Sequence, residues 1–334
     1  MRGTRAHRFL LVGAAGLAVA LASACSSGAA SDSPSSSAGP ELSTVNLYMT
    51  SSADEAPVWL AEQDGFFKQE GLTVNIVYAA SSGAIIPSIA AHTADFTQLN
   101  YVTIFAEEAK SPQLGIRVIA DDDQAAPNTS VVMVSKSSKL TSVAQLKGKT
   151  VAFPSASVDD GSLALDEQLR GYGIKPSAYT VVPISFADML SPLTQGEVNA
   201  AFEVPPFITV AEAKAGAKPL IDLMSGPMAG FPSTGWATDA SFLAKYPKTV
   251  AAFQRAIEKG QQVAASDPAL VRKILPAHIK GLSASLASVM ALQTYNTTLS
   301  ATRLQRVVDV MQQFGYLPSS FNLNSMLVPL PSGS

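Results

Sequence analysis

The sequence predicts an α/β fold of mostly parallel sheets flanked by helices and divided into two lobes. Short β-rich runs alternate with helical patterns along most of the chain, as in parallel sheets whose strands are joined by helices. The alternation breaks at Pro127 and restarts at Thr150, and about 290 residues follow Ser43, more than one core usually contains. We therefore expect a discontinuous first lobe, 44–130 and 231–330, and a second lobe, 131–230.

The individual elements follow from hydrophobic spacing and from turn residues. Strands are expected at 45–49, 72–78, 95–99, 116–121, 130–134, 150–153, 179–183, 200–202, 219–223 and 236–238. Pro57 can open the first helix and Gly65 can close it. Further helices are expected at 85–90, 101–109, 162–172, 186–194, 207–215, 242–246, 250–266, 269–275, 286–294 and 304–314. Polar turns therefore follow most of the predicted strands.

The N-terminus resembles a bacterial lipoprotein signal. Three arginines precede the apolar run 9–20, and small residues lead to Cys25, which is the only cysteine. One departure is Ala22 where this signal usually has a branched apolar residue. The resemblance implies a signal peptide, 1–24, cleaved before a lipidated Cys25. A buried thiol without a lipid is the alternative.

The composition of the residues after this signal indicates the class of protein. Residues 25–43 are dominated by Ser, Ala, Gly and Pro, which predicts a flexible linker. Without the three arginines of the signal, 20 basic residues face 26 acidic ones, so we expect no nucleic-acid partner. No later apolar run is long enough to span a bilayer, and no thiol remains for a disulfide. We expect an extracytoplasmic monomer held at the outer face of the cell membrane by its lipid.

Three stretches resemble the solute-binding proteins of the nitrate, sulfonate, taurine and thiamine-pyrimidine group. The clearest is 56–74, APVWLAEQDGFFKQEGLTV. Residues 146–152, LKGKTVA, resemble the turn into the second lobe, and 195–206, QGEVNAAFEVPP, resemble the stretch that usually reads Gly-x-x-Asp-Ala. Asn199 stands where that stretch usually has Asp.

The resemblance implies the type II periplasmic-binding-protein fold, in which two α/β lobes are joined by two hinge strands. It also implies a function: such a protein closes on a small-molecule solute and delivers it to the permease of an ABC importer. Elementary topology agrees with this, because ligands of open α/β sheets lie beyond the carboxyl ends of the strands. Two lobes on a hinge can close around such a ligand.

The turns after the strands supply the candidate ligand-binding residues. These are Ser51, Ser52, Asp54, Ser81, Ser82, Gly83, Asn100, Tyr101, Ser155, Ser157, Asp159, Glu203, Thr234 and Trp236. Serine, Asn and Asp at such positions also cap helices, so capping is the alternative role for each of them. Tyr101 and Trp236 are aromatic and can stack on a ligand or fill the core. For Glu203, an inter-lobe hydrogen bond is the alternative.

The distribution of positive charge predicts the charge of the solute. No Lys or Arg occurs in the windows that contain these turns, 44–67, 69–109, 118–135, 150–169, 176–213 and 219–244. We therefore expect a neutral or amine-bearing solute, for example a heterocycle such as a thiamine-pyrimidine precursor stacked on Trp236 or Tyr101. The alternative is a sulfonate, taurine or nitrate held by backbone amides and helix N-termini.

Two other classes of function compete with solute binding. A eukaryotic branch of the same group synthesises the thiamine pyrimidine with iron, His and Cys. Here the histidines are His7, in the signal, and the isolated His92 and His278, so we expect no enzyme activity, metal or cofactor. A structural lipoprotein without a ligand is the third class.

Overall fold

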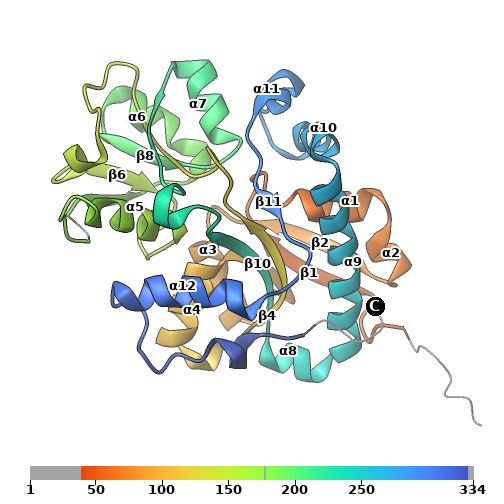
Figure 1. The fold of residues 1–334 in the computed structure, drawn as a ribbon. Helices are drawn as coiled ribbons and strands as arrows, with labels where there is room; N and C mark the ends of the chain where they lie inside the picture. The colour runs from red at the N-terminus through yellow and green to blue at the C-terminus, as the bar shows by residue number, and fades with distance from the viewer. Residues whose placement is uncertain (1–38, 177, 330–334) are drawn as a thin grey trace, which may run out of the picture. The chain divides into compact units, whose positions relative to one another are not determined.

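A computed structural model of the chain describes residues 39–176 and 178–329, and their strands form two sheets (Figure 1). The predicted signal peptide and Cys25 lie outside the described residues. Within the described ranges, no helix is both long and apolar enough to cross a membrane. The two sheets with their helices belong to one compact unit of the chain, 39–334.

The first sheet has six strands in the order β11-β4-β10-β3-β1-β2. Its strands are β1 (Thr44–Met49), β2 (Thr73–Tyr78), β3 (Phe96–Asn100), β4 (Ile116–Gln124), β10 (Pro232–Asp239) and β11 (Thr294–Tyr295). Strand β1 pairs in parallel with β2 and β3, whereas β10 is antiparallel to β3 and β4. The expected strand 236–238 is thus the C-terminal part of a longer strand, β10, inside the sheet.

The second sheet has five strands in the order β7-β6-β8-β5-β9. They are β5 (Val131–Val134), β6 (Thr150–Phe153), β7 (Thr180–Pro183), β8 (Ala200–Glu203) and β9 (Lys218–Asp222). Strand β6 is parallel to β7 and β8, and β5 is antiparallel to β8 and β9.

The chain passes between the sheets twice, through 125–130 and 223–231. Each crossing enters the new sheet from the side facing the other sheet, so β5 and β10 run opposite to the parallel strands beside them. The crossings are tied together by backbone hydrogen bonds from Leu223 to Ser130 (2.9 Å) and from Ala125 to Phe231 (2.9 Å). The carboxyl ends of the parallel strands of both sheets therefore point toward the same gap.

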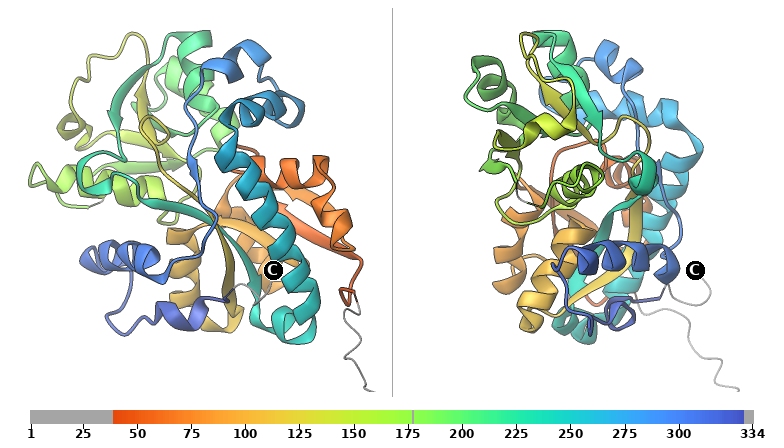
Figure 2. Two further views of the ribbon diagram at one scale, coloured as in Figure 1. Left: turned by 45° about the vertical axis from the view of Figure 1, so that its right-hand side comes forward. Right: turned by 60° about the vertical axis from the view of Figure 1, so that its left-hand side comes forward.

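Helices cover both sheets (Figure 2). In the described part of the chain, nine helices follow strands of the first sheet, either directly or after another of these helices. They are α1 (Ala56–Gln63), α2 (Phe66–Gln69), α3 (Ser82–Ala90), α4 (Tyr101–Lys110), α8 (Ala240–Lys245), α9 (Pro247–Ser266), α10 (Pro268–His278), α11 (Ala284–Val289) and α12 (Ala301–Gln313). Those of the second sheet are α5 (Asp160–Arg170), α6 (Leu190–Gln195) and α7 (Phe207–Ala215). Short 3-10 turns are η1 (Pro112–Leu114), η2 (Val143–Leu146), η3 (Phe186–Asp188), η4 (Gly226–Met228) and η5 (Leu323–Met326). We call the first group with its sheet the first half and the second group with its sheet the second half.

Aromatic packing joins the first sheet to α9. Phe96 of β3 stacks on Phe253 of α9 with ring centroids 3.9 Å apart, and Trp236 of β10 meets the same ring edge-on at 6.2 Å. All three side chains are fully buried. Burying a large apolar side chain contributes about 1.5–3 kcal/mol. This cluster therefore places β10, and the polar residues at its N-terminal end, with respect to the rest of the sheet.

Two predicted helices differ from the structure. The expected helix 186–194 is interrupted, because Phe186 packs between the rings of Phe202 and Phe207 in a tight turn and α6 begins only at Leu190. The expected helix 286–294 was wrong at its end: α11 stops at Val289, and Thr294–Tyr295 pair with β4. There, sheet pairing prevails over local helical spacing.

Residues 41 and 42, which we expected in the flexible linker, are held against the start of α9. The Glu41 carboxylate accepts hydrogen bonds from the backbone N–H groups of Lys248 (3.0 Å) and Thr249 (2.6 Å) at the start of that helix. Burial opposes ionisation of Glu41, but these hydrogen bonds prevail and lower its pKa to about 2. Contacts with α9 are thus already present before β1.

Gly260 allows α9 to approach α1 closely, and a side chain there should separate them. A Cβ atom at 260 would overlap the Pro57 carbonyl oxygen, which belongs to the backbone and cannot rotate away. For Gly260→Ala we expect the free energy of unfolding to fall by about 1–3 kcal/mol, measured by urea unfolding. Gln262→Ala on the exposed face of α9 is the control, with a change below about 0.5 kcal/mol. Equal stability of the two variants would contradict the close approach.

Candidate functional site

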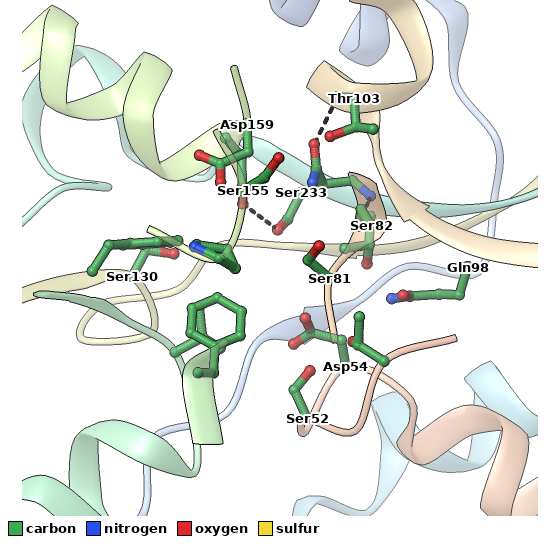
Figure 3. A pocket seen from close by; sticks show the side chains of 18 of the residues that line it. Ser52, Asp54, Ser81, Ser82, Gln98, Thr103, Ser130, Ser155, Asp159 and Ser233 are labelled. Carbon is green, nitrogen blue, oxygen red and sulfur yellow. Dashed lines mark hydrogen bonds between the residues drawn. The ribbon is translucent and has the colours of Figure 1, made fainter. Parts of the chain in front are cut away.

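A polar cleft lies where the carboxyl ends of the strands of the two sheets meet. Its lining includes nine of the predicted ligand-binding residues, namely Ser52, Asp54, Ser81, Ser82, Gly83, Asn100, Ser155, Asp159 and Thr234. Figure 3 shows side chains from both halves pointing into this space. We refer to this cavity as the cleft.

The loop after β1 brings Ser52 and Asp54 to the cleft. Its shape is set by Glu55, whose carboxylate accepts hydrogen bonds from the Ser52 backbone N–H (2.7 Å) and hydroxyl (3.0 Å) and also from the Thr50 hydroxyl. The Glu55 carboxylate therefore makes its hydrogen bonds within the loop. Asp54 points into the cleft and accepts a hydrogen bond from the Gln293 amide.

On the same side, the starts of α3 and α4 supply hydroxyl and amide groups. Ser81 caps α3 by accepting the Ala84 N–H (3.3 Å), and Asn100 caps α4 by accepting the Thr103 N–H (2.8 Å). The Ser82 hydroxyl accepts the Asn100 N–H (3.2 Å), which ties the two helix starts together. Capping and lining are thus combined in the same side chains.

From the second half, α5 begins at the cleft. The Oδ1 atom of Asp159 caps this helix by accepting the Ser162 N–H at 2.8 Å, whereas its Oδ2 is buried and has no hydrogen-bond partner. Buried polar atoms are rarely left unpaired, because desolvation without a partner costs about 1–3 kcal/mol. Asp159 Oδ2 is therefore a suitable acceptor for a donor on a bound molecule.

Behind the cleft, Thr234 joins β10 to the end of β4. Its hydroxyl lies 3.0 Å from Asp122 Oδ2 and 2.9 Å from Asp123 Oδ1, and the Gln98 amide donates to the same Asp122 oxygen at 3.0 Å. Asp122 Oδ1 and Asp123 Oδ2 have no partners. Five carboxyl groups thus lie at or directly behind the cleft, counting Asp54, Asp159 and Asp160 that line it.

The electrostatics of these acids are governed by burial. Desolvation raises the pKa of Asp122 and of Asp159 to about 7 and that of Asp160 to about 6. Burial, reinforced by neighbouring carboxylates, also raises the pKa of Asp54 and Asp123 well above the usual range. No Lys, Arg or His is among the described residues that line the cleft. A bound molecule that carries positive charge or many hydrogen-bond donors would interact favourably with these carboxyls, whereas a bound anion would be repelled by them.

The two halves touch directly at the cleft. The Ala53 N–H donates to the Pro205 carbonyl across the gap (3.1 Å), and the Ser233 hydroxyl of β10 donates to Asp160 of α5 (3.2 Å). The cavity between them is about 40 Å³, enough for roughly three water molecules. Any larger solute requires the halves to part.

Five predicted residues do not line the cleft. Trp236 and Tyr101 are fully buried: the first packs on α9, and the second donates its hydroxyl to Asp121 at 2.7 Å. Ser51 and the exposed Ser157 lie outside the lining, and Glu203 lines a different cavity. The alternation of strand side chains explains Glu203, because Phe202 and Val204 beside it face the cleft.

Thirteen further described residues line the cleft and were not predicted from the sequence. They are Thr50, Gln98, Thr103, Ala125, Thr129, Ser130, Pro154, Asp160, Phe186, Phe202, Val204, Ser233 and Gln293. Gln98 carried a usable signal, since it is polar within an otherwise strand-like run. Gln293 carried none, because only the fold brings it to Asp54. Phe186 and Phe202, rather than Trp236 and Tyr101, provide the aromatic surface of the cleft.

A family described as "NMT1/THI5 like" matches residues 52–270, which is more than half of the chain. The chain belongs to the NMT1/THI5-like family. Its match to 4-amino-5-hydroxymethyl-2-methylpyrimidine phosphate synthase THI13 of Saccharomyces cerevisiae is 22% identical over 224 residues. That match covers 64% of each protein, so the NMT1/THI5-like chain spans less than two thirds of its yeast relative.

Solved structures share the fold of this NMT1/THI5-like protein. The alkanesulfonate-binding protein SsuA from Xanthomonas axonopodis pv. citri, bound to MOPS, has a TM-score of 0.72 at 17% identity, over 88% of this chain and 100% of SsuA. The nitrate-binding protein NrtA from Synechocystis PCC 6803 has a TM-score of 0.67 at 14% identity, over 86% of this chain and 85% of NrtA. The fold is therefore the periplasmic-binding-protein fold, as expected.

The raised carboxyl pKa values predict that the folded state loses stability as the pH rises. Asp159 has a usual pKa of 3.8 and a folded-state pKa of about 7, so the folded state binds its proton more tightly than the unfolded state does. Its contribution is complete below about pH 4 and is lost progressively up to about pH 7. Asp159→Asn keeps the capping oxygen and removes this titration. We expect it to reduce the loss of unfolding free energy between pH 5 and 8 by about 1–3 kcal/mol, measured by urea unfolding at both pH values.

Asp64→Asn is the matched control, because Asp64 is exposed at the end of α1. It should change the unfolding free energy by less than about 0.5 kcal/mol at both pH values. Glu41, with its pKa of about 2, changes its protonation below pH 5, so it does not affect the comparison between pH 5 and 8. A wild-type protein that is equally stable at pH 5 and 8 would contradict the burial of ionisable carboxyls at the cleft.

Proposed function

We propose that the chain is an extracytoplasmic solute-binding lipoprotein that captures a small neutral or amine-bearing solute between its halves and delivers it to an ABC importer. The observation that carries this proposal is the cleft itself, which combines hydroxyls, amides and three lining carboxyls with no cationic side chain among the described lining residues. Its position at the strand ends, between halves linked by two crossings, supports a function that needs closure around a ligand.

An aminopyrimidine is the solute class that best suits these groups. A carboxyl that is protonated near neutral pH offers an O–H donor beside a carbonyl acceptor, and an aminopyrimidine offers a ring-nitrogen acceptor beside an amino donor. Asp159, with its pKa of about 7 and its unpartnered oxygen, has this character. The half-buried ring of Phe186 provides an apolar face for the heterocycle. The name of the yeast relative contains the same aminopyrimidine, which supports this choice.

The alternative solutes are sulfonate, taurine and nitrate, which the names of the structural neighbours suggest. A simple oxyanion would meet buried carboxyls and no cation in the described lining, and its binding would rest on backbone N–H groups alone. We therefore place these anions second.

Solute charge can be tested by calorimetric titration. We expect 4-amino-5-hydroxymethyl-2-methylpyrimidine to bind and its phosphate ester to bind at least tenfold more weakly, because the added charge meets the cleft carboxyls. Asp54→Asn should weaken binding of the pyrimidine about tenfold, or roughly 1.4 kcal/mol. Asp64→Asn, on the exposed end of α1, is the matched control and should bind like the wild type. Tight binding of nitrate or an alkanesulfonate without the pyrimidine would overturn the proposed solute class.

The proposal also makes the chain a binding protein and not an enzyme of the pyrimidine-synthesising kind. Neither described histidine lines the cleft: His92 is exposed and lies 3.6 Å from Asp239, and His278 stacks on Trp59 with ring centroids 4.7 Å apart. The described residues contain no cluster of three His, Cys, Asp or Glu arranged to hold a metal ion. A bound solute recovered with altered mass after incubation would favour the enzyme.

Membrane attachment is tested at Cys25. If this residue carries lipid, the wild type expressed in a bacterium should partition into the detergent phase of a Triton X-114 extraction, whereas Cys25→Ala should partition into the aqueous phase. The physical reason is that each buried methylene contributes about 0.8 kcal/mol, so two or more acyl chains hold a folded domain at a membrane. Identical partitioning of the two proteins would refute the lipid anchor.

A further inference from the structure

A second cavity lies beside the cleft and also has walls from both halves. Its volume is about 190 Å³, and it is lined by η3, the end of β8 and α7 on one side and by residues 279–282, between α10 and α11, on the other. Phe186 belongs to the lining of both cavities. We call this space the second cavity.

Most of the wall is apolar. The Phe186 and Phe207 rings stack with centroids 5.7 Å apart, and Leu190, Val210 and Leu282 complete much of the surface. An engineered apolar cavity of about 150 Å³ is known to hold benzene. The second cavity therefore has room for one six-membered ring with small substituents.

One ionisable group lies inside this apolar wall. The Glu203 side chain, at the end of β8, is only 1% exposed, and its Oε2 atom is buried without a hydrogen-bond partner. Burial raises the pKa of Glu203 well above its usual range, which favours the neutral form of the carboxyl, with both an O–H donor and a carbonyl acceptor. A neutral carboxyl left unpaired in an apolar wall is suited to a hydroxyl group on a ligand.

The rim of the second cavity has the opposite character. Lys214 of α7 and Lys280, which follows α10, are both exposed lining residues, one from each half. Neither forms an ion pair with any described residue. Two ammonium groups at one rim, neither with an ion-pair partner among the described residues, favour an anionic group near them.

We propose that the second cavity is a binding site for a small ring carboxylate that carries a hydroxyl group. The ring occupies the space beside Phe186 and Phe207, the hydroxyl pairs with Glu203, and the carboxylate lies at the rim near Lys214 and Lys280. Because the walls and the two lysines come from both halves, such a ligand binds only when the halves are together. The second cavity thus differs from the cleft in both polarity and the charge that it selects.

The probe for the test is 4-hydroxybenzoate, titrated into the wild-type protein with no cleft solute present. We expect saturable binding, about tenfold weaker binding of benzoate, which lacks the hydroxyl, and about tenfold weaker binding of 4-hydroxybenzyl alcohol, which lacks the charge. Glu203→Leu should remove the preference for the hydroxyl, and Lys214→Met with Lys280→Met should remove the preference for the carboxylate.

A matched pair of substitutions controls for unspecific effects. Val210→Trp places an indole in the second cavity and should abolish binding, whereas Val289→Trp places the same group on the surface of α11, where the valine is 74% exposed, and should bind like the wild type. No saturable binding by the wild type, or equal binding by Val210→Trp and the wild type, would overturn the proposal. Because the titration needs no pyrimidine, its failure is distinct from a failure of the proposed cleft solute.

Discussion

The burial of carboxyl groups without a cation beside them is the constraint on which the rest of this structure depends. Five such acids gather where β1, β4 and α5 end or begin, and none of them is more than 9% exposed. Charges in such a place are costly, so the acids respond by holding their protons at higher pH than usual. Hydroxyl and amide donors from Thr234 and Gln98 offset part of the cost and leave specific oxygens free. The solute charge that we propose for the cleft rests on this balance.

The same polar residues build the scaffold and line the cleft. Asp159 holds the first turn of α5 with one oxygen and presents the other to the gap, while Asn100 and Ser81 hold α4 and α3. A helix start needs acceptors for its free N–H groups, and the end of a parallel strand is where those starts gather. From the sequence, capping a helix and facing a ligand were alternative roles for these residues. The structure shows that one side chain can cap a helix and line the cleft at the same time. This sharing explains why the site is rich in Ser, Asn and Asp.

Much of the fold could be predicted because its signals are local. The strand at 150–153 and the helix at 207–215 have the bounds expected from their spacing, and Gly65 ends the first helix in a left-handed conformation, with φ of 71°. The predictions are wrong where contacts between segments distant in the sequence determine the local structure. Tyr295 joins the edge of the first sheet and donates to the Ala53 carbonyl, 242 positions away, so helical spacing before it misled the prediction. Trp236 was expected among the turns at the cleft, where an aromatic ring can stack on a ligand, whereas it lies within β10 and its indole packs on Phe253 of α9.

By itself, the sequence determined the α/β class, the order of most strands and helices, the family resemblance and nine residues of the cleft, because periodicity, turn chemistry and capping act over a few residues. It also showed that the turns at the cleft lack basic residues. Only the tertiary structure decided which aromatic rings face the cleft, that Gln293 reaches Asp54, and that Glu203 belongs to a separate cavity. These facts depend on which face of a strand is covered and on how two halves meet. Both are set by contacts between residues far apart in the chain.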